Sequence, residues 1–315
     1  MVSELCRPTE LTRSGLRTLL KKVKLLLFDA DGVLWDGYTA KNGAVDAVAK
    51  LVNMGFRVAI VSNNSTGSRV AYAEKCRKLG FDHFGVSNVV CSSAVVADYA
   101  SRLRQWNGTE KVYVIGEPGI GQELDAVGIP HTGIGLDNVE DPEQLYHWEI
   151  EQELDPEVKA VIVGFDSKVS YRKISAASIY VSLRGCHFLA TNTDATMKSP
   201  SGVEFPGTGS LVAAMATAAG SQPVVMGKPE RPMADYVSRS FGVPFSEMLM
   251  IGDRLETDIQ FGRRNGMQTV LTLGGVHGLA DVDAAIEKKE KSSVPHFFVR
   301  DMEALGALLQ DDLLL

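Results

Sequence analysis

Near the start of the chain stands Leu25-Leu26-Leu27-Phe28-Asp29-Ala30-Asp31-Gly32, in which four apolar residues are followed at once by two carboxylates. An apolar run of this length predicts a strand that is buried on both faces, as in a parallel sheet. Parallel sheets bind their ligands at the carboxyl ends of the strands. Residues two apart in an extended chain point the same way, so Asp29 and Asp31 are expected to face one small volume. The stretch therefore predicts a reactive sheet edge rather than a piece of core.

Three later apolar runs also end in polar residues that suit a site. They are Val58–Val61 before Ser62-Asn63-Asn64, Pro223–Gly227 before Lys228, and Met248–Ile251 before Gly252-Asp253, with Asp258 five residues beyond Asp253. If the four runs are strands of one parallel sheet, joined by crossovers of one hand, their carboxyl ends lie along one edge. We therefore expect these polar side chains to converge on a single site.

Phosphoryl transfer is the chemistry that fits this set of residues. Mg²⁺ prefers oxygen ligands and usually takes one or two protein carboxylates together with water and phosphate oxygens. Asp29 and Asp253 suit this role, together with the backbone carbonyl of Asp31. A carboxylate can also attack phosphorus to form an acyl phosphate, and Asp29 is the expected nucleophile. Asp31 is then placed to protonate the leaving oxygen and later to deprotonate the attacking water.

The other polar residues are expected to bind the phosphate or to support the site. The groups predicted to hold or neutralise the phosphoryl oxygens are Ser62, the amides around Asn63 and Asn64, and Lys228. Asp258 lies on a helix that the pattern starts near Leu255. From there we expect it to orient Lys228 or Asp253.

At these positions the chain resembles the haloacid dehalogenase superfamily. The matching stretches are Asp29-Ala30-Asp31-Gly32-Val33, Ser62-Asn63-Asn64-Ser65-Thr66, Gly227-Lys228-Pro229 and Gly252-Asp253 with Asp258. Leu34-Trp35 and the residues of the second and fourth motifs are similar to the branch of 4-nitrophenylphosphatases, phosphoglycolate phosphatases and pyridoxal phosphate phosphatases. The resemblance runs from about Leu26 to Gly275 and implies a Mg²⁺-dependent phosphatase of small phosphate monoesters, with phosphoglycolate and pyridoxal phosphate among the possible substrates.

The resemblance also implies a role for each matching residue. It makes Asp29 the nucleophile and Asp31 the acid and base. The metal ligands that it implies are Asp29, Asp31 and Asp253, and the phosphate contacts are Ser62, Asn63, Asn64 and Lys228. Superfamily members that transport ions tend to carry Thr at the position of Asp31, so this residue favours a phosphatase.

The long segment between the second and third motifs has an α/β rhythm of its own. Strands are predicted at 111–116, 158–164 and 187–191, and helices at 122–127 and 171–184. A gap of this length is too long for a loop. We therefore predict an α/β fold with a doubly wound, Rossmann-like core of residues 1–98 and 208–315 and an inserted cap domain of residues 99–207. The resemblance implies that such a cap covers the site and restricts substrate entry.

Composition limits the partners and the compartment. The net charge is −7 and no basic block occurs, so neither nucleic acid nor an anionic membrane is an expected partner. No apolar run approaches the roughly 20 residues of a membrane helix. The four cysteines have no zinc-site spacing and are expected to be reduced and mostly buried. A cytoplasmic protein is therefore expected, although the basic segment 7–24 also has the composition of an organellar address. The resemblance implies pairing of two chains through the cap.

Two parts of the predicted cap remain open to more than one interpretation. Asp166, Asn192 and Asp194 follow predicted strands, where they either contact substrate or cap turns and helices. The strongly acidic segment 137–156 is expected to be a loop or short surface helix with a solvated face.

Functions other than hydrolysis also fit part of the pattern. A receiver-like phosphoacceptor module uses acidic residues and Mg²⁺, but Asp31 and the long insertion oppose that interpretation. A scaffold that has kept the motifs without turnover would be expected to depart from them, and no motif position does. A phosphotransferase that passes the phosphoryl group to an acceptor other than water would use the same residues as a phosphatase.

Overall fold

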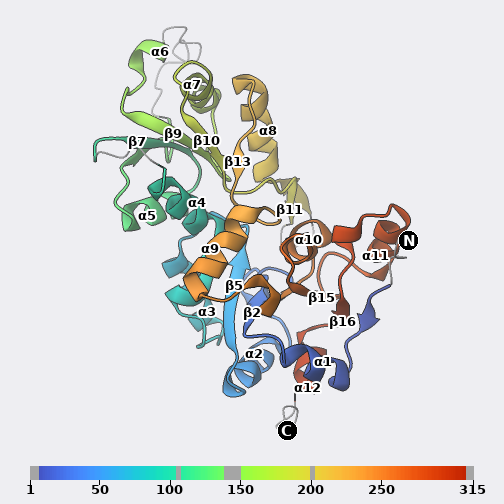
Figure 1. Cartoon of the computed structure of the whole chain (residues 1–315). Helices are drawn as coiled ribbons and strands as arrows, with labels where there is room; N and C mark the ends of the chain where they lie inside the picture. Colours follow the sequence, from blue (N-terminus) through green and yellow to red (C-terminus); the bar gives the residue numbers. More distant parts are fainter. Residues whose placement is uncertain (1–6, 104–107, 138–149, 199–202, 310–315) are drawn as a thin grey trace. The chain divides into compact units, whose positions relative to one another are not determined.

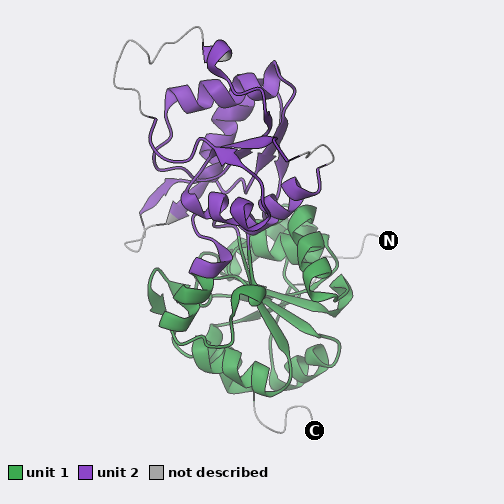
Figure 2. Ribbon diagram, turned by 90° about the vertical axis from the view of Figure 1, so that its left-hand side faces the viewer, with its two compact units in different colours: residues 1–62, 72–90, 228–315 green, residues 63–71, 91–227 purple. Residues whose placement is uncertain are grey.

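The structure is a computed structural model that describes residues 7–103, 108–137, 150–198 and 203–309. The chain forms two compact units, which Figure 2 shows in different colours. Unit 1 consists of Met1–Ser62, Tyr72–Val90 and Lys228–Leu315, and unit 2 consists of Asn63–Ala71 and Cys91–Gly227. Each unit is built around its own parallel sheet.

Unit 1 contains a seven-stranded sheet (Figure 1). Its strands, in spatial order, are β1 (Thr9–Glu10), β16 (Phe297–Val299), β15 (Gln268–Thr272), β14 (Met248–Gly252), β2 (Leu25–Phe28), β5 (Arg57–Ser62) and β6 (Val89–Cys91). The pairings from β1 across to β5 are all parallel. The four residues of β2 are fully buried between β14 and β5, as the apolar run predicts. Three of the four predicted strand ends therefore meet at one sheet edge.

Helices and short turns connect these strands. The helices are α1 (Arg13–Leu20), α2 (Ala44–Asn53), α3 (Arg69–Lys78), α9 (Arg231–Phe241), α10 (Gln260–Arg264), α11 (Leu279–Glu287) and α12 (Met302–Leu308). A small hairpin of β3 (Trp35–Asp36) and β4 (Thr39–Ala40) follows β2, and a π-helical turn, Leu255–Ile259, follows β14. The helix α9 shows why such segments fold here, because Met233, Ala234, Val237 and Phe241 recur at helical spacing and are buried.

Unit 2 contains a five-stranded parallel sheet. Its order is β13 (Val224–Val225), β10 (His187–Ala190), β9 (Val158–Val163), β7 (Lys111–Ile115) and β8 (His131–Thr132). Its helices are α4 (Ser92–Ser101), α5 (Pro118–Ala126), α6 (Ile150–Glu153), α7 (Tyr171–Ser182) and α8 (Thr208–Ala219), and a hairpin joins β11 (Thr196–Lys198) to β12 (Glu204–Pro206). The predicted strands and helices of this segment are present, and the parallel α/β fold class is confirmed.

The run Pro223–Gly227 does not join the sheet of unit 1, contrary to the expectation of one shared sheet. Its residues Val224 and Val225 form β13, which pairs in parallel with Leu189 and Ala190 of β10 in unit 2. Lys228, directly after this run, is the first residue of the last stretch of unit 1. The run is thus the last part of unit 2, and Lys228 directly after it belongs to unit 1.

The unit boundaries also differ from the predicted division at 98/99 and 207/208. Helix α8 packs against α7, and its residues Val212, Met215 and Ala216 lie in one apolar cluster with Ala177 and Tyr180 of α7. Helix α4 packs against α5. Residues 91–98 and 208–227 therefore belong to unit 2, because their apolar faces are buried there, and residues 63–71 belong to it through polar contacts such as that of Arg69 with Glu123.

Several smaller expectations can be compared with the described residues. Cys76, Cys91 and Cys186 are buried free thiols, as expected, whereas Cys6 lies outside the described residues. In the acidic segment 137–156 the described part contains the short helix α6, and residues 138–149 lie outside the description. Across the portion of the chain that the structure describes, every helix is too short or too polar to span a bilayer.

His296 leads to a first prediction, because it is held between β15 and α10. Its Nδ1 lies 2.9 Å from Thr269 Oγ1 and its Nε2 lies 2.5 Å from Arg263 Nη1. Burial, assisted by the Arg263 cation, lowers the pKa of His296 to about 4. The unfolded chain then binds more protons below pH 6.5, so this contribution to stability is complete above pH 6.5 and is lost as the pH falls toward 4. We expect about 1 to 2 kcal/mol of the free energy of unfolding to disappear between pH 7.5 and pH 5 through this group.

Urea unfolding at the two pH values measures this effect. His296→Gln should reduce the loss of stability on acidification, and His83→Gln, at an exposed position of the same unit, should leave it unchanged. An equal loss in the parent chain and in His296→Gln would show that His296 is not the responsible group.

Candidate active site

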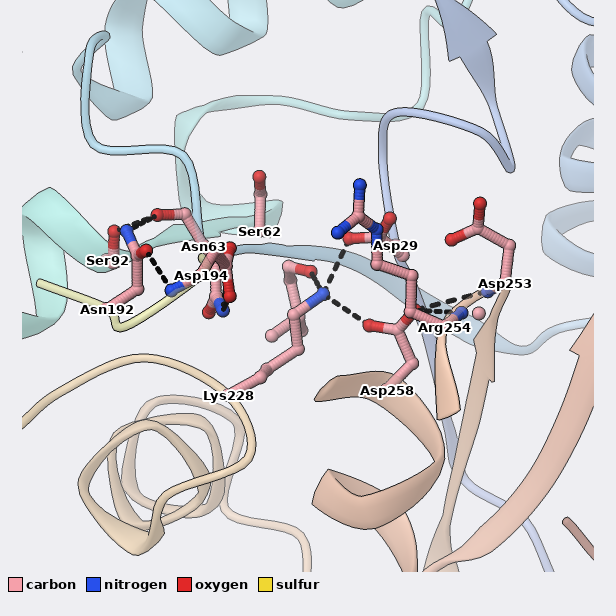
Figure 3. A network of polar contacts seen from close by, with 12 residues as sticks. Asp29, Ser62, Asn63, Ser92, Asn192, Asp194, Lys228, Asp253, Arg254 and Asp258 are labelled. Carbon is pink, nitrogen blue, oxygen red and sulfur yellow. Dashed lines mark hydrogen bonds and ion pairs between the residues drawn. The ribbon is translucent and has the colours of Figure 1, made fainter. Parts of the chain in front are cut away.

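Lys228 lies at the centre of a buried polar network at the sheet edge of unit 1 (Figure 3). Its Nζ donates to Asp29 Oδ1 at 2.5 Å, to Asp258 Oδ1 at 2.7 Å and to the Val61 carbonyl at 2.7 Å. The side chain is 2 % exposed. Burial alone would lower the pKa of Lys228, but the carboxylates of Asp258 and Asp29 outweigh it and raise that pKa. Lys228 therefore stays charged and fixes one oxygen of Asp29.

Asp258 supports both Lys228 and the loop that carries Asp253. While its Oδ1 accepts from Lys228, its Oδ2 accepts from the backbone N–H groups of Asp253 and Arg254, each at 3.1 Å. The π-helical turn after β14 places the side chain there. Asp258 was expected to orient Lys228 or Asp253, and the contacts show that it holds both.

Three carboxylates in this network form a group that suits a cation. Asp29, Asp253 and Asp258 each offer an oxygen within 4.8 Å of the others. Both oxygens of Asp258 already accept from N–H groups, which leaves Asp29 and Asp253 as the better ligands. Asp253 Oδ2 accepts from Val276 N at 2.9 Å, whereas its buried Oδ1 has no hydrogen-bond partner among the residues described. Burial, and then the neighbouring Asp258 carboxylate, raise the pKa of Asp253 to about 7. An unsatisfied buried oxygen beside a second carboxylate fits a divalent metal ion.

Two glycines leave room for Asp253. A Cβ atom on Gly32 would lie 2.2 Å from Asp253 Oδ2, and one on Gly275 would lie 2.0 Å from the same oxygen. Gly32 also has a φ of 91°, which other residues rarely adopt. Any side chain at either position would displace the carboxylate.

Asp31 lies outside the carboxylate cluster and is half exposed. Its Oδ1 accepts from the indole Nε1 of Trp35 at 3.0 Å, and 50 % of its side chain is accessible. Partial burial raises the pKa of Asp31, while Lys75 opposes that shift. A carboxyl group with a raised pKa at an accessible position suits an acid and base. The Asp31 side chain is not part of the carboxylate group formed by Asp29, Asp253 and Asp258. A metal-ligand role of the Asp31 backbone carbonyl stays a prediction.

The predicted phosphate contacts fall in both units. Ser62 ends β5 in unit 1, and its Oγ lies 3.2 Å from the Tyr72 hydroxyl. Asn63 and Asn64 belong to unit 2. Asn64 Oδ1 accepts from the N–H and hydroxyl of Thr66 at 2.9 and 2.7 Å, which forms a local turn. Their roles toward phosphate stay predictions.

Asn63 is held by several residues of its own unit. Its Nδ2 donates to Asp194 Oδ1 at 3.0 Å, and its carbonyl accepts from Ser92 Oγ at 2.5 Å and from Asn192 Nδ2 at 2.8 Å (Figure 3). Asn192 and Asp194, which sequence reasoning left as substrate contacts or turn residues, therefore fix Asn63. Asp166 pairs instead with the buried Lys173 at 2.8 Å.

Sequence reasoning missed the surroundings of Asp31, namely Trp35 and Lys75, and Tyr72, which packs against the Trp35 ring. Trp35 was used only as part of a family pattern, and the two residues of α3 had no role. The spacing of Tyr72 and Lys75, three residues apart on one helix, would have placed both on one face. No sequence signal indicates that this face meets Asp31.

Comparisons with known proteins identify the family of the chain. Residues 26–130 match the family model described as haloacid dehalogenase-like hydrolase, and residues 225–305 match a second model, described as HAD-hydrolase-like. Human glycerol-3-phosphate phosphatase is 39% identical over 313 residues, which cover 96% of each chain. Phosphoglycolate phosphatase 2 of Arabidopsis thaliana is 37% identical and covers 94% of this chain and 99% of its own.

A solved structure with bound metal is also similar. The glycerol phosphate phosphatase of Mycobacterium tuberculosis in complex with magnesium superposes with a TM-score of 0.73 at 26% identity. The match covers 91% of this chain and 78% of that one. A divalent metal therefore occurs in a protein of the same fold.

Proposed function

The chain belongs to the haloacid dehalogenase-like hydrolases and is a phosphoric monoester hydrolase, and from this we propose hydrolysis of small phosphate esters through a phosphorylated Asp29, with Mg²⁺ as cofactor. The observation that carries the mechanism is the contact of Lys228 Nζ with Asp29 Oδ1. This contact occupies one oxygen of Asp29. Among the described residues, Asp29 Oδ2 accepts no hydrogen bond, so it is the oxygen that attacks phosphorus.

The first half of the reaction transfers the phosphoryl group to Asp29. As the bond from Asp29 Oδ2 to phosphorus forms, the bond from phosphorus to the ester oxygen breaks and Asp31 donates its proton to that oxygen. Lys228 balances negative charge beside the new acyl phosphate, with Asp258 holding it in place. Ser62, Asn63 and Asn64 are the proposed donors to the phosphoryl oxygens.

The second half releases phosphate and restores the enzyme. Asp31 removes a proton from a water molecule whose oxygen bonds to phosphorus, and the bond between phosphorus and Asp29 breaks to return the carboxylate. The proposed Mg²⁺ ligands are Asp29, Asp253 and the carbonyl of Asp31, and the bound ion would neutralise charge on the phosphoryl oxygens.

Small organic phosphates are the proposed substrates. The relatives are named for glycerol 3-phosphate and phosphoglycolate, two small monoesters, which supports this class. We further propose that unit 2 contains the cap that restricts substrate entry. Pairing of two chains through that cap, and a cytoplasmic location, stay predictions.

Removal of metal tests the proposal. We expect release of inorganic phosphate from 4-nitrophenyl phosphate, glycerol 3-phosphate and phosphoglycolate to fall at least about 100-fold in excess chelator, because Asp29 and Asp253 then face the phosphate without a divalent metal ion. Excess Mg²⁺ should restore it. Mg²⁺ should not restore activity in Asp253→Asn to the parent level, because the unsatisfied Oδ1 site is altered. Full activity in chelator, or phosphorylation of the chain without release of phosphate, would contradict the proposal.

A further inference from the structure

One hydrogen-bond donor and one cation lie beside the same oxygen of the Asp31 carboxyl. Trp35 Nε1 donates to Asp31 Oδ1 at 3.0 Å, and Lys75 Nζ lies 3.8 Å from that oxygen. In the part of the chain that the structure describes, Asp31 Oδ2 has no hydrogen bond. The two oxygens of this carboxyl therefore differ in their surroundings, and all three residues belong to unit 1.

The indole of Trp35 is a rigid donor. Trp35 is 0 % exposed, and its ring contacts Phe81 and Tyr72 at centroid distances of 5.9 and 6.4 Å. Backbone hydrogen bonds close the turn on which it lies, from Gly32 N to the Trp35 carbonyl at 2.8 Å and from Trp35 N to the Ala30 carbonyl at 3.2 Å. The direction of its N–H group is therefore fixed relative to Asp31.

Lys75 is held against the same ring. Its Nζ lies 4.5 Å from the centroid of the Trp35 ring and 5.4 Å from that of Tyr38. Cation–π contacts of this kind favour one position of the ammonium group over the many that a lysine samples in water. The side chain is 24 % exposed. Lys75 is thus a partly buried cation that is fixed beside Asp31.

We propose that Trp35 and Lys75 are positioning residues that hold the Asp31 carboxyl by Oδ1, so that Oδ2 faces the ester oxygen and exchanges the proton with it. Trp35 Nε1 donates to Oδ1 and the Lys75 cation lies beside the same oxygen, which leaves Oδ2 as the oxygen without a hydrogen bond among the described residues and therefore the one open to the ester oxygen. This inference rests on the proposed function, since it assigns an atom to the acid step. Without the two residues the carboxyl can rotate, and the acid is less often aligned with the leaving oxygen.

The leaving group distinguishes this role from a general loss of structure. 4-Nitrophenolate leaves without a proton, whereas the alkoxide of glycerol 3-phosphate requires one. The ratio kcat/KM reports formation of the phosphoenzyme, which includes departure of the leaving group. For Lys75→Met and for Trp35→Phe we expect kcat/KM to fall at least about 10-fold on glycerol 3-phosphate and less than about threefold on 4-nitrophenyl phosphate. Lys75→Arg should recover most of the loss, because it keeps the cation over the ring.

Three controls make the test specific. Lys78→Met removes the same charge from an exposed position on the same helix and should change kcat/KM on neither substrate. In an Asp31→Asn background, Lys75→Met should cause no further selective loss, because its partner no longer transfers a proton. Thermal unfolding of each variant should show that Lys75→Met remains folded.

The outcomes separate this inference from the proposed function. If the parent chain hydrolyses neither substrate, the proposed function fails. If the parent is active and Lys75→Met lowers kcat/KM by the same factor on both substrates, Lys75 does not position the acid. Phosphoglycolate gives a further contrast, because its leaving group carries a carboxylate and that of glycerol 3-phosphate is neutral. A loss in Lys75→Met that is confined to phosphoglycolate would show that Lys75 binds substrate charge, which overturns the positioning role.

Discussion

Asp29→Asn is expected to lower phosphate release by at least about 10⁴-fold while the chain stays folded. The carboxamide lacks the negative charge that makes Asp29 Oδ2 a nucleophile. Asn keeps an oxygen that can accept from Lys228, so the contact of 2.5 Å has a replacement and the network is preserved. Turnover of a saturating phosphate monoester measures the loss, and circular dichroism with thermal unfolding checks the fold.

Two further measurements make the role of Asp29 specific. Asp82→Asn, an exposed carboxylate of the same unit, should keep parent activity. Rapid acid quenching of the parent with substrate should trap a phosphorylated peptide that contains Asp29, and the Asp29→Asn chain should give none. Activity of Asp29→Asn within about tenfold of the parent would assign the nucleophile to another group.

Lys228→Met is expected to reduce both activity and stability. The lysine is the only buried cation that contacts Asp29 and Asp258 among the described residues, and without it two carboxylates stay buried without compensation. Removing one partner of a buried ion pair typically costs about 3 to 5 kcal/mol, so the free energy of unfolding in chelator should fall by about that amount. Activity should fall at least about 100-fold, because the charge beside the acyl phosphate is lost.

A double variant separates charge from packing at this position. Lys228→Met with Asp258→Asn should be more stable than Lys228→Met alone, because one uncompensated charge is removed. Lys78→Met serves as the control for loss of a lysine at an exposed position. If Lys228→Met has the same free energy of unfolding as the parent in chelator, Lys228 does not compensate the charge of the two carboxylates.

Local patterns were sufficient to predict most strands and much of the site. The run Leu25–Phe28 forms a fully buried strand, because four consecutive apolar residues suit a parallel strand that is covered on both faces. Lys228 and Asp258 contact each other as expected, although the run before Lys228 belongs to the other sheet. Several carboxylates at one sheet edge favour binding of a divalent metal ion and phosphoryl transfer.

The remaining features depend on tertiary packing that no local pattern contains. Val224 and Val225 are apolar enough for either sheet, and nothing in the run itself indicates that they pair with β10. Lys75 looks like an ordinary helix-surface lysine in sequence, and its place over the Trp35 ring follows from how α3 packs on the turn after β2. From sequence, Asn63 was predicted only to contact phosphate. Its hydrogen bonds with Ser92, Asn192 and Asp194 join residues that are far apart in the chain, so no local pattern indicates them.

The short segment Asn63–Ala71 determines how this protein can be recombined with its relatives. It is joined to the rest of unit 2 by the contact of Arg69 with the buried Glu123 at 2.8 Å and by the hydrogen bond from Gly119 N to the Thr66 carbonyl at 3.2 Å. A chimera that exchanges only residues 99–207 would bring a foreign side chain to position 123 while Arg69 stays with the host. The exchangeable piece consists of two stretches, 63–71 and 91–227, and a recombination event that preserves folding must transfer both or restore a partner for Arg69.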